Sequence, residues 1–467
     1  MALLRDWSAR VARLVLVLWL WPSPAVAAAV AEPGARSDAT ASGRQRPDLV
    51  LILVDALRAD RLSVSGYGRP TTPRLDRRRS ELRWFTDAVT HATHTVPSVA
   101  SLFVGVPPRL HKIQWDPRTR SFPPNGQHPR LETSLPTLPE VLSAAGYDTR
   151  AFVGNPWITE ENRFNRGFGV FEGWRAWDRD GTNDDKAILE TVASVLEASS
   201  ERPRFVYAHL MSVHSPYDKG HRELVREMGV DRFVNGLREA SPRDITFMSD
   251  VYDSDVLYVD GLVGGLLDAL SARAGSRPVA VCVFGDHGEE FHEHGGFGHN
   301  TTLFQELVQV PVLFWGPGLV DRTGPSDYPF ELIDVRRIFT ALAGVSDDAA
   351  VGLVSSVLPA PPTPGERLRA IELDAQKALY LRPWKYIVTR EPFEERLYNL
   401  AVDGTERVNR VVVDAEMAAK LRTIAQRLWP ELPYPAVDPA APSLFVRLAC
   451  VSGVVSVVIL LVLLRRL

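Results

Sequence analysis

Short, continuous apolar runs that stop abruptly constrain the fold of this chain more than any other feature. LVLILV at 49–54 ends at Asp55, and VAVCVFG at 279–285 ends at Asp286. Such runs are typical of parallel strands that are buried on both faces of a sheet. The same pattern recurs at AFVG (151–154), RFVYAHL (204–210) and VPVLFW (310–315).

Helical patterns separate these runs. LPEVLSAAG ends at Gly146, as helices often do, and residues 256–273 keep apolar side chains at helical spacing. This alternation predicts one doubly wound α/β domain at 48–345, with a mostly parallel sheet sandwiched by helices. In this architecture ligands bind at the carboxyl ends of the strands, where Asp55 and Asp286 both lie.

The pattern changes after residue 345. Residues 378–400 have the composition of two or three strands, and residues 414–429 form an amphipathic helical pattern. We therefore expect a small C-terminal α+β subdomain at 346–434.

The first 27 residues have the features of a signal peptide. Arginines precede an apolar run from Leu14 to Trp21, and Ala25-Val26-Ala27 has the small side chains of a cleavage site. The run is much shorter than the roughly 20 residues of a spanning helix. We expect residues 1–27 to direct export and the small, polar residues at 28–47 to form a flexible leader.

The other end is apolar enough to anchor the chain. The segment from Leu448 to Leu464 carries no charge, and arginines follow it. We expect a linker at 435–443, a transmembrane helix at 444–464 and a cytoplasmic tail at 465–467. Export and anchoring together place both domains on the extracytoplasmic side of a membrane.

The stretch FGDHGEEFHEHGGFGHN, residues 284–300, holds four of the chain's 11 histidines. Asp286 and His287 follow a strand, where the chain turns and both side chains can face one point. Glycines let the backbone approach a ligand closely, and His299 follows such a glycine. His292 and His294 are either further ligands or, as we favour, a solvated rim. The stretch indicates a metal site, with a solvated charged loop as the alternative.

A second group of polar residues lies in THTVPSVASLFVG, residues 93–105, which predicts a helix that stops at Gly105. A hydroxyl just before a helix N-terminus meets the positive end of the dipole and unpaired backbone N–H groups. Thr95 either has a functional role in this position, or Thr95 or Ser98 only caps the helix.

Four motifs, in order along the chain, resemble those of the sulfatase family within the alkaline phosphatase superfamily. The resemblance runs from about residue 48 to 430 and implies that family's fold, a mostly parallel sheet between helices with a small C-terminal subdomain. It is carried by PDLVLILVDALRADRLSVSGYGRPTTPRLD, TVPSVASLFVG, VFGDHGEEFHEHGGFGHNTTLFQELVQVPVLFWGPG and ERLYNLAVDGTERVN.

The resemblance also implies roles for individual residues. Asp55, Asp286 and His287 would hold one divalent metal ion together with Thr95, which falls on the position of the nucleophile. His214, in HSPYD, and His299 match residues that contact the anionic group or its leaving oxygen.

The chain departs from the family at the nucleophile. Sulfatases have Cys or Ser there, converted to formylglycine, and an arginine four residues on; this chain has Thr95 and Val99, so we expect no formylglycine. Ala56 replaces the usual second aspartate, and Gly154-Asn155-Pro156-Trp157 replaces a Gly-Lys-x-His segment. A single hydroxyl cannot expel the anion as a formylglycine hydrate does, so water must release the ester. That route is ordinary for phosphoryl groups.

The expected cofactor is one divalent metal ion. An imidazole ligand favours manganese or zinc, with magnesium or calcium as alternatives. We predict a metal-dependent hydrolase of sulfate, phosphate or phosphonate esters that acts through a covalent Thr95 intermediate. The rivals are a head-group transferase of the phosphoethanolamine or phosphoglycerol type and a non-catalytic binding protein.

The sequence leaves the substrate open between a small molecule and a glycan or lipid ester. Four tryptophans either stack on a sugar or aryl group or belong to the core: Trp115, Trp157, Trp174 and Trp177. The net charge of −4 gives no reason to expect a nucleic acid partner.

Overall fold

The chain divides into two units, the first ending at Val354 and the second starting at Ser355. The computed structural model describes residues 45–115, 130–173, 184–219, 221–229, 239–273, 277–317, 320, 322–347 and 366–434. The predicted signal peptide, the linker, the transmembrane helix, the tail and most of the leader lie outside these ranges, as do Trp174 and Trp177. Among the residues that the structure describes, no helix is long and apolar enough to cross a bilayer.

An eight-stranded sheet forms the centre of the first unit, with strand order β11-β2-β10-β7-β1-β6-β4-β5. Its four central parallel strands are β7 (Val279–Gly285), β1 (Asp48–Val54), β6 (Arg204–Leu210) and β4 (Asp148–Val153). The remaining strands are β2 (Leu82–Phe85), β5 (Val170–Glu172), β10 (Val312–Trp315) and β11 (Gly324–Ser326). The predicted α/β fold with a mostly parallel sheet is confirmed.

The direction of one strand differs from the expectation. The apolar run at 310–315 was expected to be parallel, but β10 pairs antiparallel with both β7 and β2. Between β7 and β10 lie only a short hairpin, β8 (Glu290–Phe291) with β9 (Phe297–Gly298), and helix α11 (Gln305–Val308). No long crossover helix returns the chain to the other end of the sheet, so the chain runs back beside β7 in the opposite direction.

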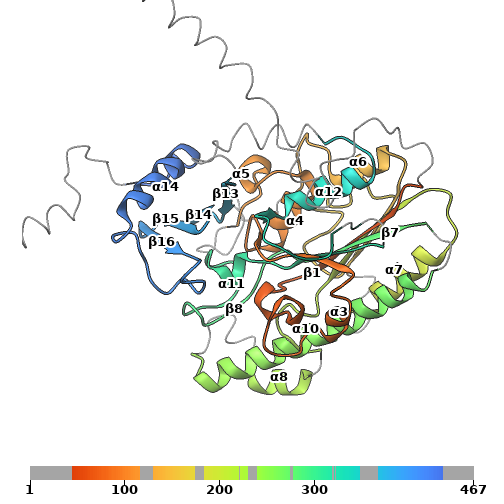
Figure 1. The fold of residues 1–467 in the computed structure, drawn as a ribbon, viewed down its shortest axis with the longest axis horizontal. Coiled ribbons are helices and arrows are strands. Elements are labelled where there is room, and N and C mark those ends of the chain that lie inside the picture. Colours follow the sequence, from red (N-terminus) through yellow and green to blue (C-terminus); the bar gives the residue numbers. More distant parts are fainter. Residues whose placement is uncertain are drawn as a thin grey trace, which may run out of the picture. The chain divides into compact units, whose positions relative to one another are not determined.

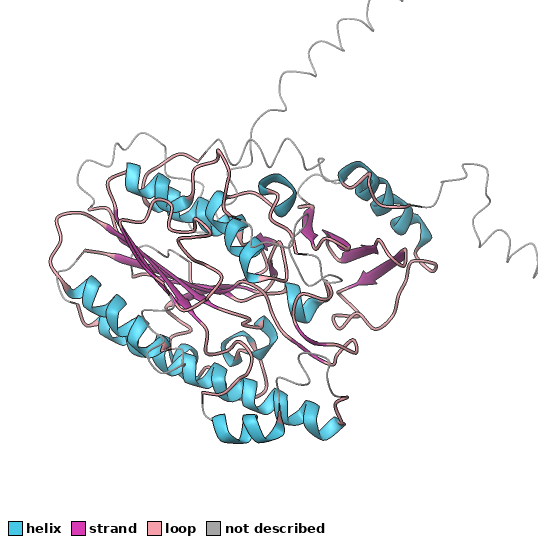
Figure 2. Cartoon of the chain, turned by 180° about the vertical axis from the view of Figure 1, so that it is seen from behind, coloured by secondary structure: helices cyan, strands magenta, loops and turns pink. Residues whose placement is uncertain are grey.

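Helices cover both faces of the sheet because its central strands are apolar on both sides. Leu49, Leu51 and Leu53 of β1 pack in one core with α4 (Thr95–Val104), α6 (Leu138–Ala144) and α12 (Ile333–Leu342). The alternate residues of β1 pack in a second core with α3 (Pro73–Arg77), α7 (Asp185–Glu197) and α10 (Pro242–Ser271). In Figure 1 the first set of helices lies above the sheet and the second below it; Figure 2 shows the same layers from behind.

Local signals set the limits of the helices. Helix α6 starts with a capping box of Thr137 and Glu140, and α10 with one of Ser241 and Asp244. The segment at 256–273 proves to be the C-terminal half of α10, which is 30 residues long. Helix α4 ends where Gly105 adopts a left-handed conformation with φ of 74°.

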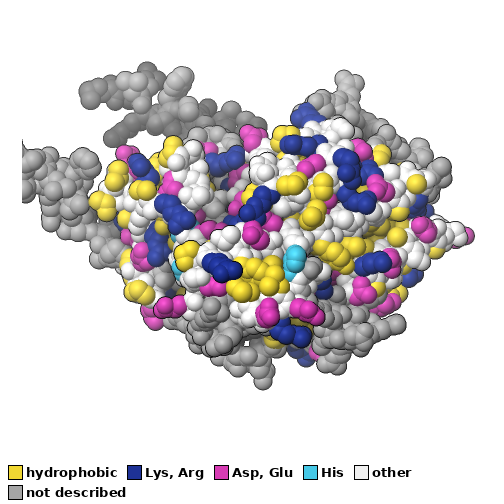
Figure 3. Space-filling view, turned by 90° about the horizontal axis from the view of Figure 1, so that it is seen from below, with side chains coloured by type: hydrophobic (Ala, Val, Ile, Leu, Met, Phe, Trp, Pro, Cys, Tyr) yellow, Lys and Arg dark blue, Asp and Glu magenta, His cyan; other side chains and the backbone are white. Residues whose placement is uncertain are grey.

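The remaining short elements of the first unit connect these layers. They are η1 (Ala59–Arg61), η2 (Ser63–Ser65), β3 (Ala88–Val89), which pairs with β12 (Phe330–Glu331), α5 (Pro108–His111) and α8 (Arg222–Met228). On the face of the molecule in Figure 3, basic and acidic side chains are interspersed, and no large area carries one sign of charge.

The second unit has a four-stranded antiparallel sheet, β13 (Arg369–Glu372), β14 (Gln376–Leu381), β15 (Trp384–Thr389) and β16 (Glu394–Asn399). Three of these strands lie within or beside the 378–400 segment, and β13 precedes it. Helix α14 (Ala415–Leu428) packs its apolar side chains, Leu421 among them, into a core with the sheet. The small C-terminal α+β subdomain is therefore present, with one strand more than expected.

Candidate metal and catalytic site

Polar side chains lie at the carboxyl ends of four neighbouring parallel strands. Asp55 comes directly after β1, and Asp286 and His287 come directly after β7. Since Val54 pairs with Gly285, the two aspartates start from neighbouring strands at the same edge of the sheet. Strand β6 contributes His209, and Asn155 follows β4. The strand order β7-β1-β6-β4 thus gathers residues that are far apart in the sequence.

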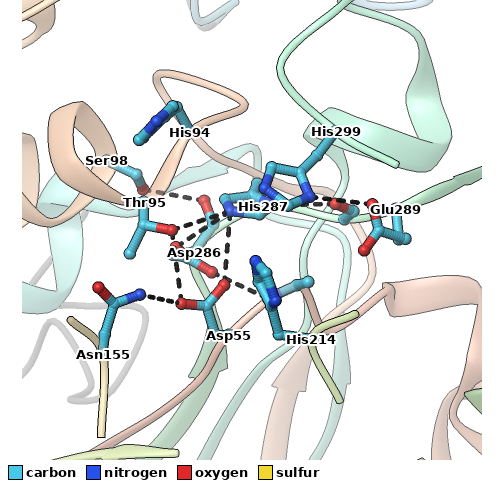
Figure 4. Close-up of polar contacts among 12 residues, drawn as sticks. Asp55, His94, Thr95, Ser98, Asn155, His214, Asp286, His287, Glu289 and His299 are labelled. Atoms are coloured by element: carbon cyan, nitrogen blue, oxygen red, sulfur yellow. Dashed lines mark hydrogen bonds and ion pairs between the residues drawn. The ribbon is translucent and has the colours of Figure 1, made fainter. Parts of the chain in front are cut away.

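Three of the predicted metal ligands converge on one point. His287 Nε2 lies 3.6 Å from Asp55 Oδ1 and 3.4 Å from Asp286 Oδ2, and all three side chains are fully buried. Among the described residues, these three are the one group of histidine, cysteine or acidic side chains whose ligand atoms lie close enough to share a metal ion, within 4.8 Å of one another. Figure 4 shows them facing one another.

Neighbouring groups occupy one oxygen of each carboxylate and leave the other open. Asp55 Oδ2 accepts hydrogen bonds from Asn155 Nδ2 at 2.7 Å and from His209 Nε2 at 3.0 Å. Asp286 Oδ1 accepts the backbone N–H of Ala56 at 3.2 Å, so a backbone group of Ala56 contacts this site. Asp55 Oδ1 and Asp286 Oδ2 are buried and have no hydrogen-bond partner.

The ring of His287 is oriented by its own turn. Its Nδ1 atom donates to the carbonyl of Gly288 at 2.9 Å, which leaves Nε2 directed at the two carboxylates. Gly288 is required there because a Cβ atom would lie 1.9 Å from the backbone oxygen of Glu306. Burial lowers the pKa of His287 to about 3, so the ring is neutral, as a metal ligand must be.

The charges of the two aspartates also indicate a cation. Burial raises the pKa of Asp55, but the hydrogen bond from His209 and the charge of His214 outweigh burial and hold that pKa well below its usual range. Burial and the nearby charge of Asp55 raise the pKa of Asp286 well above its usual value. Two buried carboxylates with open oxygens, a neutral imidazole and a hydroxyl fit one divalent metal ion.

Thr95 occupies the first position of α4 and is not the cap of that helix. His94 is the N-cap residue, and its Nδ1 atom accepts the N–H of Val96 at 3.2 Å. Thr95 Oγ1 lies 3.4 Å from Asp55 Oδ2 and 3.3 Å from His287 Nε2. Ser98 is not the cap either, because its hydroxyl donates to the backbone oxygen of Asp286 at 2.8 Å. The alternative that Thr95 or Ser98 only caps the helix is therefore wrong.

The rings of His214 and His299 lie next to each other, beside the three predicted metal ligands. Their ring centroids are 5.0 Å apart, and the ring of His299 is 4.4 Å from that of His287. His299 Nδ1 lies 3.0 Å from Glu289 Oε1. Burial lowers the pKa of His299, but the charge of Glu289 outweighs burial and raises it. Figure 4 shows His214, His287, His299 and Glu289.

The other two histidines of the 284–300 stretch lie outside this group. His292 is exposed and stacks on Phe297, as a rim residue would. His294 was also expected on a solvated rim, but its side chain is only 10% exposed. It stacks on Phe304 and holds Glu306 at 2.6 Å, so apolar and ionic contacts together bury it.

Sequence reasoning missed His209, Glu289 and His94 as neighbours of the site, and it named Asn155 only as a departure from the family's lysine. His209 carried a signal, because it is a polar residue near the end of an otherwise apolar run. Of the four tryptophans considered in the sequence, the structure describes Trp115 and Trp157; the ring of Trp115 packs against that of His94 at a tilt, with ring centroids 4.4 Å apart. Trp157 is 42% exposed, two residues after Asn155. Neither tryptophan belongs to the fully buried core.

Comparison with known proteins identifies the relatives of this site. A family model described as Sulfatase matches residues 47–344, more than half of the chain. Delta 4,5-hexuronate-2-O-sulfatase of Bacteroides thetaiotaomicron is 21% identical over 421 residues, which cover 79% of this chain and 86% of the relative. Phosphoethanolamine transferase EptC of Escherichia coli is 24% identical over 326 residues, 66% of this chain and 52% of EptC. The chain spans about half the length of the curated transferases it matches, 45% to 52%.

Solved structures share the fold. Phosphonate monoester hydrolase of Agrobacterium radiobacter matches with a TM-score of 0.60 and 18% identity, over 82% of this chain and 96% of that protein. The C-terminal periplasmic domain of Escherichia coli EptC, in complex with zinc, matches with a TM-score of 0.50 and 20% identity, over 70% of this chain and 90% of that domain.

Proposed function

Because the chain belongs to the sulfatase family, we propose that it is a metal-dependent hydrolase of sulfate, phosphate or phosphonate esters that acts through a covalent intermediate on Thr95. The observation that carries this proposal is the position of the Thr95 hydroxyl. It lies 3.3 Å from His287 Nε2 and 3.4 Å from Asp55 Oδ2, at the N-terminus of α4. A hydroxyl among metal ligands at the positive end of a helix dipole is well placed to become a nucleophile.

The residues present divide the reaction between them. Asp55, Asp286, His287 and Thr95 would hold one divalent cation, which when bound lowers the pKa of the Thr95 hydroxyl and stabilises negative charge on the ester oxygens. Thr95 Oγ1 attacks the central sulfur or phosphorus atom in line, and the bond to the leaving oxygen breaks. Since Thr95 has a single hydroxyl, no formylglycine chemistry is involved.

Two histidines would handle the protons. His299 or His214 gives a proton to the leaving alcohol as its bond to the central atom breaks. Water then attacks the covalent ester and gives a proton to the same imidazole, and the bond from the central atom to Thr95 Oγ1 breaks. Thr95 Oγ1 takes back from solvent the proton that it released to solvent before its attack. The mutual packing of the His214 and His299 rings, 5.0 Å apart, supports a shared task on the leaving-group side.

The ligand set and the relatives bear on the metal. Two carboxylates with one imidazole favour manganese or zinc over calcium, with magnesium as an alternative. The zinc complex of the EptC domain supports zinc.

We further propose that residues 1–27 direct export and that 444–464 anchor the protein, with the catalytic unit on the extracytoplasmic side.

The relatives support a second candidate, a head-group transferase. EptC is a phosphoethanolamine transferase, and a transferase would share the first half of the reaction on Thr95. The two functions differ in the acceptor, because a hydrolase passes the group to water and a transferase to another hydroxyl. Incubation of the enzyme with a phosphodiester or phosphonate ester and a large excess of a sugar alcohol decides between them. A phosphorylated alcohol as the main product favours the transferase.

Replacement of Thr95 tests the nucleophile. We expect Thr95→Ala to lower kcat by at least about 10³-fold against any ester that the parent protein cleaves, because the covalent step is removed. Thr95→Ser should keep part of the activity, since it keeps the hydroxyl. Rapid quenching of the parent enzyme followed by peptide mass spectrometry should find the sulfuryl or phosphoryl group on Thr95.

Ser101→Ala is the matched control, because Ser101 is a buried hydroxyl on the same helix that bonds only to Pro97 O and His111 Nε2. It should leave kcat within a few-fold of the parent. Normal turnover by Thr95→Ala would exclude the covalent mechanism.

A further inference from the structure

Glu289 is a buried carboxylate that has no role in the proposed metal binding or in the attack by Thr95. Its side chain has no exposed surface, and its Oε1 atom lies 3.0 Å from Nδ1 of His299. The ring of His299 lies between Glu289 on one side and His287 on the other, 4.4 Å from the latter (Figure 4). Glu289 therefore contacts the site through His299.

A short hairpin builds this contact. Strand β8 pairs antiparallel with β9, and Glu290 lies opposite Gly298. Glu289 directly precedes β8 and His299 directly follows β9, so the two residues flank the paired ends of the hairpin. The pairing of β8 with β9 therefore brings the two side chains near each other.

The backbone on both sides of Glu289 is fixed by further contacts. Arg58 Nη1 donates to the backbone oxygen of Glu289 at 2.7 Å. The N–H of Gly288 donates to the backbone oxygen of Leu307 at 2.8 Å. Because the turn cannot shift easily, the carboxylate of Glu289 stays where the ring of His299 meets it.

The contact decides which ring nitrogen of His299 serves the site. The two nitrogens of an imidazole point away from each other, so a ring that donates Nδ1–H to Glu289 presents Nε2 on the far side. A carboxylate accepts a hydrogen bond and cannot donate one when ionised, so Nδ1 keeps its proton. Nε2 is then the nitrogen that gains and loses a proton.

We propose that Glu289 is the positioning residue of the reaction: it fixes the orientation and tautomer of His299, so that Nε2 gives a proton to the leaving oxygen and later takes one from water. This inference rests on the proposed hydrolase function. In the first half, the bond from the central atom to the leaving oxygen breaks, and that oxygen keeps the electron pair and receives the Nε2 proton. In the second half, water gives a proton to Nε2 as it attacks the Thr95 ester, and the bond from the central atom to Thr95 Oγ1 breaks. Glu289 itself gains no proton.

Two esters of the same anion test the role, one with a 4-nitrophenyl and one with an alkyl leaving group. A 4-nitrophenolate leaves without a proton, whereas an alkoxide does not. We expect Glu289→Gln in the full-length protein to lower kcat/KM, which reports the steps up to release of the leaving group, by roughly 10²-fold for the alkyl ester and by less than about threefold for the 4-nitrophenyl ester. An amide at this position can donate to Nδ1 and so favour the wrong tautomer.

Glu290→Gln is the matched control. Glu290 is the adjacent residue, is also buried, and accepts the N–H groups of His294 and Gly296 at 3.0 and 2.7 Å, away from His299. Any effect of this variant on the two esters should be equal. Equal losses for both esters in Glu289→Gln would show a merely structural role, and loss of bound metal would assign Glu289 to the metal site; either result overturns the proposal.

A spectroscopic measurement tests the positioning role independently of the proposed function. Long-range ¹H–¹⁵N correlation spectra of ¹⁵N-histidine-labelled protein report which ring nitrogen carries the proton. The signal of His299, assigned with His299→Gln, should show a protonated Nδ1 in the parent and a changed tautomer in Glu289→Gln. An unchanged tautomer overturns the positioning role whatever the enzyme cleaves. If Thr95→Ala stays active while the tautomer changes, the proposed mechanism fails and the contact between Glu289 and His299 stands.

Discussion

Asn155 and His209 orient Asp55, which we propose as a metal ligand. Both hold the same oxygen of Asp55, at 2.7 and 3.0 Å, and so leave the other oxygen open for the proposed metal ion. His209 is in turn held by the hydroxyl of Tyr207, 3.1 Å from its Nδ1 atom. Sulfatases have a lysine where this chain has Asn155. The neutral amide of Asn155 donates a hydrogen bond to Asp55.

At the same scale we predict that Asn155→Ala and His209→Ala each weaken metal binding by about 10- to 100-fold, because Asp55 loses a partner that orients it. The measurement is the dissociation constant for Zn²⁺ or Mn²⁺, from competition with a chelator of known affinity. Asn162→Ala is the control: Asn162 donates to the backbone oxygen of Trp157 at 3.0 Å and does not contact Asp55. Unchanged metal affinity in both test variants would contradict the role given to this pair.

At the scale of elements, helix α10 supports α3 through one buried acid. Asp260 of α10 accepts the backbone N–H groups of Arg74 and Leu75, at 2.8 and 3.0 Å, in the first turn of α3. Burial raises the pKa of Asp260 from 3.8 to about 6, even though these hydrogen bonds lower it. The folded state therefore holds the proton more tightly than the unfolded state does.

The sign of the pH dependence follows from this shift. Protonated Asp260 makes its full contribution to the free energy of unfolding below pH 3.8. This contribution, on the order of 3 kcal/mol, is lost as the pH rises through 6. We predict that Asp260→Asn removes this loss between pH 4 and 6, measured by urea unfolding followed by tryptophan fluorescence. Asp268→Asn is the control: Asp268 is exposed, its hydrogen bond to Arg78 lowers its pKa, and its contribution changes only at lower pH. The same slope in Asp260→Asn and the parent would contradict the prediction.

At the scale of the whole molecule, the proposed C-terminal membrane anchor can be tested by truncation. Truncation after Pro442 removes the proposed anchor and leaves both described units intact, since the last described range ends at Tyr434. We predict that the truncated protein is recovered in the soluble fraction with unchanged kcat, whereas the full chain sediments with membranes. Cofractionation of the truncated protein with membranes would place the anchor elsewhere.

The sequence by itself determined the parts of this protein that depend on local pattern. Run length and apolar content report whether a strand is buried on both faces, so β1, β6 and β7 were predictable, and with them the strand ends that carry Asp55 and Asp286. The motifs around Thr95 and His287 placed further site residues by resemblance.

Only the tertiary structure decided which residues meet. The order β7-β1-β6-β4 brings His209 and Asn155 to Asp55, and no local pattern encodes the order of strands. The direction of β10 depended on the path of the chain between two strands, and its apolar run is the same for either direction. The contact between Glu289 and His299 depended on the pairing of the two short strands that they flank. Local patterns record burial, whereas contacts across the fold depend on how buried elements pack against one another.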